Sequence, residues 1–394
     1  MKKATSLLAL VFLFAVLPVH GQTPVSAADY VKRGLERSTK NDLDGAISDF
    51  TKATELDPRN ATAYFNRGHA RGLKGDFEGA DADFSKVIQI DPSDAAAYNN
   101  RGISRRKKGD VNGAIDDFTK ALEIKPKAQT YVNRGGARNQ KGDIEGAILD
   151  YTKAIELDPH YADAYDQRGL VRVKKGELDE AIADETRAIE IDPRQVRAYY
   201  NRGIALHQKR DFGGAIADFT SAVEIDPRNV EAYANRGQTF FDQGNVDGAI
   251  ADYTKALEID PSDAITHRLR AIARERKGNL AGAIADYSKA IEINQRYVAA
   301  YNDLAWLLAT TPNDSFRNGK QAVEFALKAS QLTNQKSPTV LDTLAAAYAE
   351  LGNFEEAVNS ENKALTFSEF VQRSGNEARQ RLQLYTEGKP YREK

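Results

Sequence analysis

Several features that ordinarily point to a chemistry are missing from this sequence. Cysteine is absent, so the chain can form no disulfide and carries no cysteine for a lipid anchor. Histidine is rare, and its copies stand far apart without the spacing of metal ligands. No glycine-rich phosphate loop is present. We therefore expect no catalytic residues, no metal and no cofactor, and a protein that is not an enzyme.

An excess of charge of either sign is also missing. The chain has 55 Lys and Arg against 57 Asp and Glu, a net charge of -2. Proteins that bind nucleic acid usually show a basic domain or stripe, so we expect no nucleic-acid partner. The mean hydropathy of -0.57 and the 41% hydrophobic content suit a soluble helical protein with a thin core.

Only residues 1–21 contain a long apolar run. Two lysines precede the run from Leu7 to Leu17, and Gly21 follows it closely. This order is typical of a secretory signal peptide, and the run is shorter than the roughly 20 residues that span a bilayer. Cleavage after Gly21 or after Ala27 satisfies the small-residue rule. We expect an exported protein, periplasmic or extracellular, with no membrane span after cleavage; the alternative is an N-terminal membrane anchor.

The feature that dominates the rest of the sequence is a repeated unit. A glycine and a proline each recur at steps of 34 residues, with a single step of 33 at the same place. The glycines are Gly34, Gly68, Gly102, Gly135, Gly169, Gly203 and Gly237, and the prolines are Pro58, Pro92, Pro126, Pro159, Pro193, Pro227 and Pro261. A period of this size predicts supersecondary units that stack into a solenoid, because one unit cannot bury its apolar face alone.

The clearest copy of the unit runs from Val196 to Asn229. Its apolar and small residues follow a spacing of three to four, which predicts two amphipathic helices. A polar break separates them. In copies such as Lys74-Gly75-Asp76 and Lys141-Gly142-Asp143 it reads Lys-Gly-Asp, where glycine can end one helix and aspartate can cap the next. The closing Asp226-Pro227 ends the second helix.

With these positions assigned, the chain resembles the tetratricopeptide repeat family. Counted from Val196, the unit has Tyr at position 4, Gly at 8, Ala at 20, Phe at 24, Ala at 27 and Pro at 32, close to the family pattern. The resemblance implies an all-α fold, a right-handed α-solenoid or superhelix of stacked antiparallel helix pairs. The predicted organisation is a signal peptide (1–21), eight regular units (27–296), two divergent units (297–366), and a capping helix with a tail (367–394).

Position 7 departs from the family pattern, because arginine stands there instead of leucine in all eight regular units. Position 23 is aspartate in all eight. Contacting positions of an antiparallel hairpin have a nearly constant sum, and positions 7 and 23 fit that rule. Both divergent units lose both residues. We predict an Arg–Asp bridge within each regular hairpin; the alternative is an arginine row that binds phosphate or carboxylate ligands, which the aspartates would neutralise.

One regular unit is irregular at its second aromatic position. Glu185 stands where the other seven units have phenylalanine or tyrosine. A carboxyl in that place predicts either a locally weaker hairpin or a polar contact within it.

The family resemblance implies that the first helix of each unit lines a concave groove, with positions 2, 5, 6, 9, 12 and 13 facing a ligand. Position 6 carries an amide in most units: Asn66, Asn100, Asn133, Gln167, Asn201 and Asn235. An amide offers a donor and an acceptor, which suits the main chain of an extended peptide. The alternative is that these amides bond neighbouring helices or face water.

Other groove positions vary and are candidates for specificity. They include Phe65, His69, Asn99, Arg106, Lys107, Tyr200, Phe241 and Arg268. Aromatic residues next to arginine resemble binding hot spots. The carboxylate clamp of chaperone-binding relatives is not supplied by any three units.

Together these features predict an exported scaffold or adaptor that binds peptides or partner proteins on the concave face. Two alternatives remain from the sequence. One is a structural component of the cell envelope, and the other is a non-catalytic accessory subunit of an envelope enzyme.

Overall fold

The computed structural model describes residues 26–393, so the predicted signal peptide lies outside the described residues. Within this range the chain forms helices and no strand. The helices of the regular units are α1 (Ala27–Thr39), α2 (Leu43–Leu56), α3 (Ala61–Leu73), α4 (Phe77–Ile90), α5 (Ala95–Lys108), α6 (Val111–Ile124), α7 (Ala128–Lys141), α8 (Ile144–Leu157), α9 (Ala162–Lys175), α10 (Leu178–Ile191), α11 (Val196–Gln208), α12 (Phe212–Ile225), α13 (Val230–Gln243), α14 (Val246–Ile259), α15 (Ala264–Arg276) and α16 (Leu280–Ile293). They are followed by α17 (Val298–Thr310), the 3-10 turn η1 (Asp314–Phe316), α18 (Gly319–Leu332), α19 (Pro338–Leu351), α20 (Phe354–Ala364) and α21 (Ser368–Thr386).

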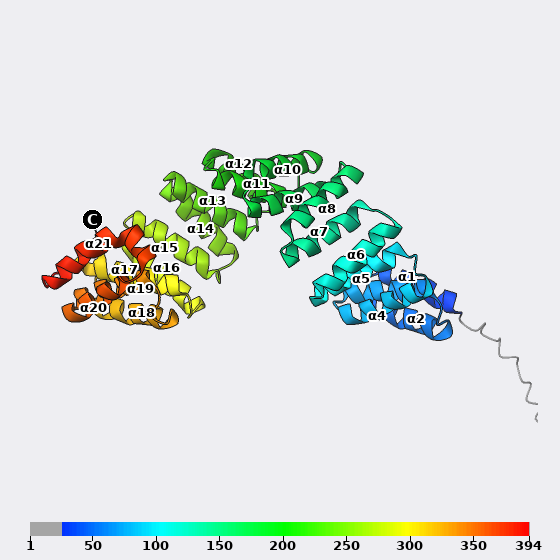
Figure 1. Ribbon diagram of the computed structural model, residues 1–394, viewed down its shortest axis with the longest axis horizontal. Coiled ribbons are helices and arrows are strands. Elements are labelled where there is room, and N and C mark those ends of the chain that lie inside the picture. Colours follow the sequence, from blue (N-terminus) through cyan, green and yellow to red (C-terminus); the bar gives the residue numbers. More distant parts are fainter. Residues whose placement is uncertain (1–25, 394) are drawn as a thin grey trace, which may run out of the picture. The chain divides into compact units, whose positions relative to one another are not determined.

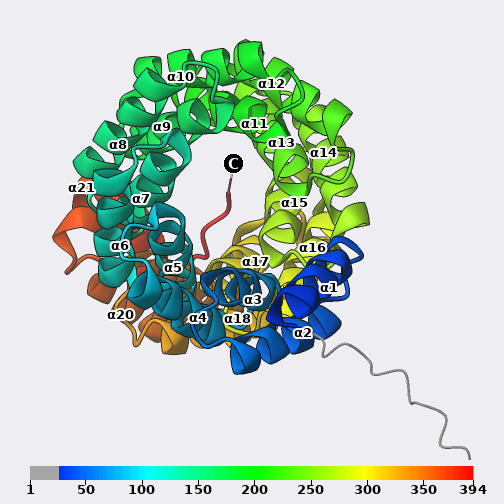
Figure 2. The ribbon, with the colours of Figure 1, turned by 90° about the vertical axis from the view of Figure 1, so that its right-hand side faces the viewer.

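The helices fall into two compact units, one ending at Ala164 and one beginning at Tyr165. Within each unit, consecutive helices pack as pairs, and each pair stacks on the next (Figure 1). The first helix of each pair lies along the inner edge of its unit, and these first helices also touch one another, as α3 does with α5 and α11 with α13 (Figure 2). The predicted all-α solenoid of stacked helix pairs is confirmed.

Short polar signals set the helix ends within each pair. In α12, for example, the Asp211 side chain accepts a hydrogen bond from the Gly214 amide and so caps the helix. Such an N-cap stabilises a helix by about 1 kcal/mol. The residue before the cap is a left-handed glycine in most pairs, but Arg210 takes that conformation in the sixth, with φ of 65°. The predicted polar break therefore forms the turn between the two helices.

The core of most regular pairs is thin and consists mainly of one aromatic ring, several alanines and a glycine. In the sixth pair Ala215 and Phe219 are buried, and Phe219 lies against Gly203. A Cβ atom at Gly203 would come within 2.8 Å of the Phe219 ring. The glycine of position 8 therefore allows the two helices to approach closely.

Each regular pair also contains the predicted Arg–Asp bridge. In the sixth pair Arg202 donates from Nε and Nη2 to the two carboxylate oxygens of Asp218, at 2.8 and 2.7 Å. The equivalent pairs are Arg33–Asp49, Arg67–Asp83, Arg101–Asp117, Arg134–Asp150, Arg168–Asp184, Arg236–Asp252 and Arg270–Asp286. The aspartates are all buried. The sequence-based prediction of a bridge in all eight hairpins is confirmed.

The bridging arginine also holds the preceding pair. Nη1 of Arg202 donates to the Thr186 hydroxyl of α10 at 3.0 Å, and its guanidinium carbon lies 5.9 Å from the centre of the Tyr199 ring. The same contact to a preceding hydroxyl recurs at Arg67, Arg101, Arg134, Arg236 and Arg270. One side chain therefore fixes the angle within a hairpin and its register on the neighbouring hairpin.

Glu185 replaces the aromatic ring of the fifth pair and is fully buried against Gly169. Burial, and then the neighbouring Asp166 carboxylate, raise the pKa of Glu185 to about 10, so the folded protein holds it as a neutral acid. Asn201 donates a hydrogen bond to Asp166 at 3.0 Å, whereas neither carboxyl oxygen of Glu185 has a hydrogen-bond partner among the described residues. The sequence-based expectation of a polar contact is therefore not met by a hydrogen bond, and a buried carboxyl without a partner fits the other expectation, a locally weaker hairpin.

A double-mutant cycle on Arg202 and Asp218 measures the bridge. We expect Arg202→Ala to lower the free energy of unfolding by about 3 kcal/mol, because it leaves the Asp218 carboxylate buried and unpaired. The coupling energy from urea denaturation should exceed about 1 kcal/mol. Arg33 and Asp49 provide the control, since the Arg33 side chain is 48% exposed and its coupling should be smaller. A coupling near zero at Arg202 would contradict the account.

Replacing Glu185 with phenylalanine should stabilise the fifth pair, and more so at high pH. Glu185 keeps its proton to about pH 10 when folded, whereas the unfolded chain releases it above its ordinary pKa of 4.5. This group therefore destabilises the fold increasingly as pH rises through that window. Circular dichroism melting of Glu185→Phe should show a larger gain at pH 8 than at pH 5. The exposed Glu190→Gln serves as the control, and an equal gain at both pH values in Glu185→Phe would refute the buried-acid explanation.

Candidate functional site

The amides of position 6 lie on the first helices, as expected, but several of them bond to protein atoms. The Asn66 side chain donates to the carbonyl of Thr62 at 2.8 Å, and that of Asn100 donates to the carbonyl of Ala96 at 2.9 Å. Both bonds stay within one helical turn. These amides keep an oxygen free to accept a hydrogen bond from a ligand.

Three other amides connect first helices of successive pairs. Asn133 donates to the Asn99 side chain at 3.0 Å. Asn235 donates to the Tyr200 hydroxyl at 3.1 Å, and Asn201, only 3% exposed, donates to Asp166. Substituting these amides would therefore weaken contacts between pairs as well as any contact with a ligand.

The remaining candidate residues differ in accessibility. Gln167 donates to the carboxylate of its neighbour Asp166, and the Phe65 ring packs edge-on against Phe84. Arg106 lies over Gly136, where a Cβ would be 2.5 Å from its Nη1. Lys107 is exposed. In the first unit a hollow of about 260 Å³ lies beside Phe65 and Asn66, and one of about 220 Å³ lies beside Asn99 and Asn100.

A larger hollow lies in the second unit, and we call it the terminal cavity. It has a volume of about 420 Å³ and is lined by side chains from α15, α16, α17, α19 and α21. Arg268 and Ile272 come from α15, Trp306 from α17 and Thr343 from α19. Counted within their helix pairs, most of the lining residues stand at positions 2, 5, 6, 9 and 12. These are the positions that the family resemblance assigns to the groove.

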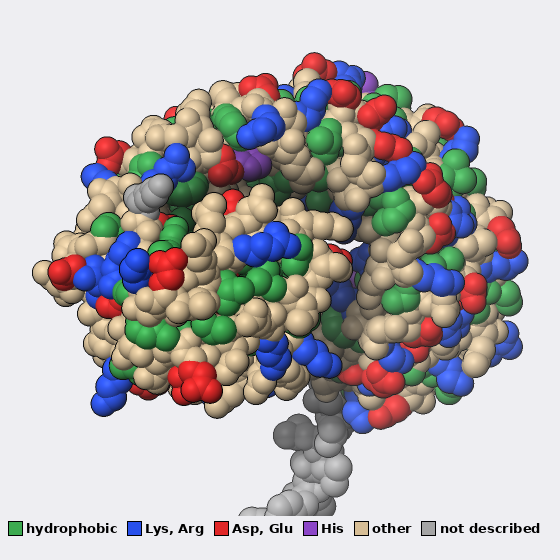
Figure 3. Space-filling model, turned by 60° about the vertical axis from the view of Figure 1, so that its left-hand side comes forward, with side chains coloured by type: hydrophobic (Ala, Val, Ile, Leu, Met, Phe, Trp, Pro, Cys, Tyr) green, Lys and Arg blue, Asp and Glu red, His purple; other side chains and the backbone are tan. Residues whose placement is uncertain are grey.

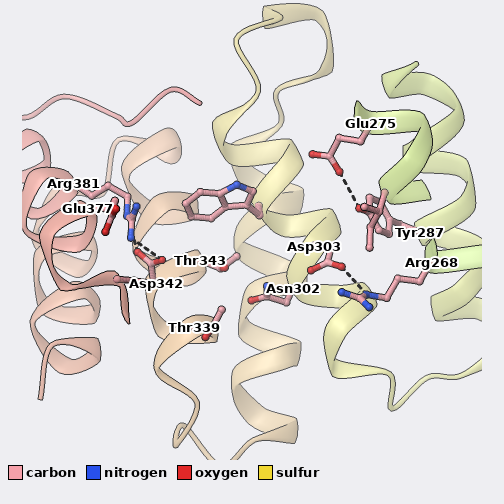
Figure 4. A pocket seen from close by; sticks show the side chains of 13 residues that line it. Arg268, Glu275, Tyr287, Asn302, Asp303, Thr339, Asp342, Thr343, Glu377 and Arg381 are labelled. Carbon is pink, nitrogen blue, oxygen red and sulfur yellow. Dashed lines mark hydrogen bonds and ion pairs between the residues drawn. The ribbon is translucent and has the colours of Figure 1, made fainter. Parts of the chain in front are cut away.

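Charged and hydrogen-bonded pairs surround the terminal cavity (Figure 4). On one side Arg268 donates from Nε to Asp303 at 2.6 Å, and the Tyr287 hydroxyl donates to Glu275 at 2.9 Å. On the other side Arg381 of α21 meets Asp342 of α19 (Figure 4). The terminal cavity is therefore bordered by polar side chains on both sides.

Glu275, which lines the cavity, and Glu361 of α20, which lies 3.7 Å from Arg381, have strongly raised pKa values. Burial raises the pKa of Glu275 to about 7, although the hydrogen bond from Tyr287 acts in the opposite direction. Burial, together with the neighbouring Asp342 carboxylate, raises the pKa of Glu361 to about 9, so Glu361 is protonated at neutral pH. Burial also raises the pKa of Asp342, which accepts two hydrogen bonds from Arg381.

Trp306 forms the apolar part of the cavity. The guanidinium carbon of Arg381 lies 5.5 Å from the centre of its ring, a cation–π distance. An indole face next to paired charges suits an extended peptide segment, whose side chains are partly apolar and partly polar. No group of three or more potential metal ligands occurs among residues 26–393.

Most residues that line the terminal cavity are not among the candidates that the sequence indicated. Arg268 is the one lining residue among the sequence-based candidates. Ile272 and Glu275 also stand at groove positions, 9 and 12, of the eighth regular unit, and the remaining first-helix residues belong to the divergent units. Extending the same positions to the divergent units would have selected Asn302, Asp303, Trp306 and Asp342. The position of Arg381 in the cavity could not be predicted from the repeat, because α21 belongs to no repeat unit. Its partner Asp342 lies 39 residues away in the sequence.

On the face drawn in Figure 3, acidic and basic side chains are interspersed. Along the part of the chain that the structure describes, no helix combines the length and the apolarity needed to cross a bilayer.

Comparison with protein families decides the family. Models described as "Tetratricopeptide repeat" match residues 61–94, 95–127 and 230–263, and a model described as "TPR repeat" matches residues 34–75, 135–176, 169–210 and 205–244. Together these matches extend over more than half of the sequence. The chain is a tetratricopeptide repeat protein. Membership of this family supports a role in protein interactions.

Solved tetratricopeptide repeat proteins resemble parts of this chain. YrrB, described as a TPR protein with an unusual peptide-binding site, is 28% identical, with a TM-score of 0.39 over 46% of this chain and 95% of YrrB. A repeat protein from Parabacteroides merdae is 21% identical, with a TM-score of 0.49 over 62% of this chain and 97% of its own. MamA is 26% identical, with a TM-score of 0.40 over 44% of this chain and 94% of MamA. No curated protein matches the chain.

Proposed function

We propose that this tetratricopeptide repeat protein is an exported scaffold that binds an extended segment of a partner protein along its first helices. The observation that carries the proposal is the terminal cavity. Three successive first helices, α15, α17 and α19, contribute an arginine, an indole and threonine hydroxyls to one hollow. The array holds these groups in place before binding, so the receptor loses little conformational entropy when a peptide docks.

The second part of the proposal is export. The signal-like residues 1–21 support it, and the first described helix favours one of the two cleavage positions. The Ser26 hydroxyl accepts from the Asp29 amide at 3.2 Å, while the Ser26 amide donates to the Asp29 carboxylate at 2.9 Å, a capping box. Cleavage after Ala27 would remove this cap, whereas cleavage after Gly21 keeps it.

The mature N-terminus tests export and the cleavage position together. We expect the protein recovered from the native compartment to begin at Gln22, because that product retains the Ser26 cap of α1. Mass spectrometry of the intact protein distinguishes this product from a chain that begins at Ala28. A chain that retains Met1 after fractionation would contradict export and favour the membrane-anchored alternative.

Site-directed photo-crosslinking tests the binding surface. A photoreactive residue replaces Thr339, which is exposed and lines the terminal cavity, and in a second variant it replaces Glu356, which is exposed on the second helix of the same pair. We expect a partner protein to crosslink in the native compartment from position 339 and not from position 356. Both variants should have the same circular dichroism spectrum and melting temperature.

Other crosslinking results would count against the proposal. Crosslinks from position 356 alone would move the binding surface to the second helices. Crosslinks only to a second copy of the chain would favour the structural alternative, a component of the envelope that assembles with itself.

A further inference from the structure

The chain does not end at α21 but turns back onto the inner side of its own unit. Gly388, with φ of 70°, separates α21 from a segment outside any helix, Lys389–Glu393, which contains Pro390 and which we call the tail. The Glu393 amide donates to the carbonyl of Thr310, the last residue of α17, at 2.9 Å. The Trp306 indole donates from Nε1 to the Glu393 carboxylate at 3.2 Å.

The two residues before Glu393 also make specific contacts. Nη2 of Arg392 lies 2.6 Å from the carboxylate of Glu350 on α19. The Tyr391 ring lies 5.9 Å from the Trp306 ring, and the Arg381 guanidinium carbon lies 5.6 Å from the centre of the Tyr391 ring. Three consecutive residues therefore place an aromatic ring, a base and an acid on complementary groups of the helices.

These contacts are the kind that a peptide makes with a receptor. A main-chain amide bonds the receptor backbone, and the side chains enter separate sites. The tail also borders the terminal cavity. Glu393 lines a second hollow of about 530 Å³, and this hollow shares Ile272 and Glu275 with the terminal cavity.

We propose that the tail is a tethered ligand of the Trp306 surface, and that a partner segment carrying an aromatic residue, an arginine and an acid displaces it. The second half of this statement rests on the proposed scaffold function. The tail stays bound because it is covalently attached. A short tether gives the tail an effective concentration in the millimolar range at the Trp306 surface. A partner segment therefore binds only when its affinity and concentration are high enough to displace the attached tail.

Trp306 is the only tryptophan of the chain, so its fluorescence reports on this surface alone. A chain truncated after Pro390 is titrated with a synthetic peptide of residues 389–394. We expect a saturable change in Trp306 emission toward that of the full-length protein. The same peptide should bind the full-length protein at least about tenfold more weakly, because the attached tail competes.

Two further variants keep the test interpretable. In the full-length chain, Arg392→Ala combined with Glu393→Ala should give the emission of the truncated protein without shortening the chain. In the truncated chain, Glu350→Gln should weaken peptide binding about tenfold, because the Arg392 pair is lost. Glu355→Gln, an exposed change on α20, is the matched control and should leave binding unchanged.

The outcomes separate this inference from the proposed function. Equal peptide affinity of the truncated and full-length proteins, or identical Trp306 emission in both, would overturn the tethered ligand. If the peptide binds as expected and the truncated chain captures more partner from position 339, the inference is supported in full.

If the peptide binds but truncation leaves partner capture unchanged, displacement by the partner is wrong. If the peptide binds and neither chain captures a partner, the scaffold function fails and so does displacement by a partner, while the tail remains a ligand of the surface.

Discussion

The rest of the structure depends on one interaction, the buried bridge between the arginine of position 7 and the aspartate of position 23. Removing a carboxylate from water is unfavourable unless its oxygens are hydrogen-bonded. Here the bridging arginine binds both oxygens, and in six pairs a second arginine, such as Arg71 at Asp83, adds another contact. The remaining amino group of the bridging arginine reaches a hydroxyl of the preceding pair, as Arg202 does at Thr186. A leucine at this position has no donor for either the aspartate or this hydroxyl.

The Arg–Asp bridges stop after the eighth pair, and the terminal cavity lies where they stop. In α17 and α19 the bridging position holds Leu304 and Leu344, which are buried in an apolar core. These two pairs have no Arg–Asp bridge between positions 7 and 23, and two of their acidic residues lie on the first helices. Asp303 and Asp342 occupy positions 6 and 5, and their partners come from a neighbouring pair and from α21. The polar groups that could meet a ligand are therefore concentrated where the regular array stops.

Much of the fold could be predicted from the sequence, because its signals are local or repeat at a fixed step. The period of 34 residues predicts the helix pairs. The nearly constant sum of contacting positions in a hairpin predicts which arginine meets which aspartate. The partners of the amides could not be predicted, since a bond such as Asn133 to Asn99 joins two repeats through a particular side-chain conformation. The contacts of α21 and the tail were equally hidden, because neither segment has a second copy in the chain to compare.

Hydrogen exchange on binding of an isolated partner tests the central claim most directly, namely that the inner side of the last helix pairs is where this scaffold binds. The account predicts slower amide exchange in α15, α17 and α19, where the terminal cavity lies, with little change in α4, α6 and α8. Slower exchange confined to those second helices of the first unit would contradict it.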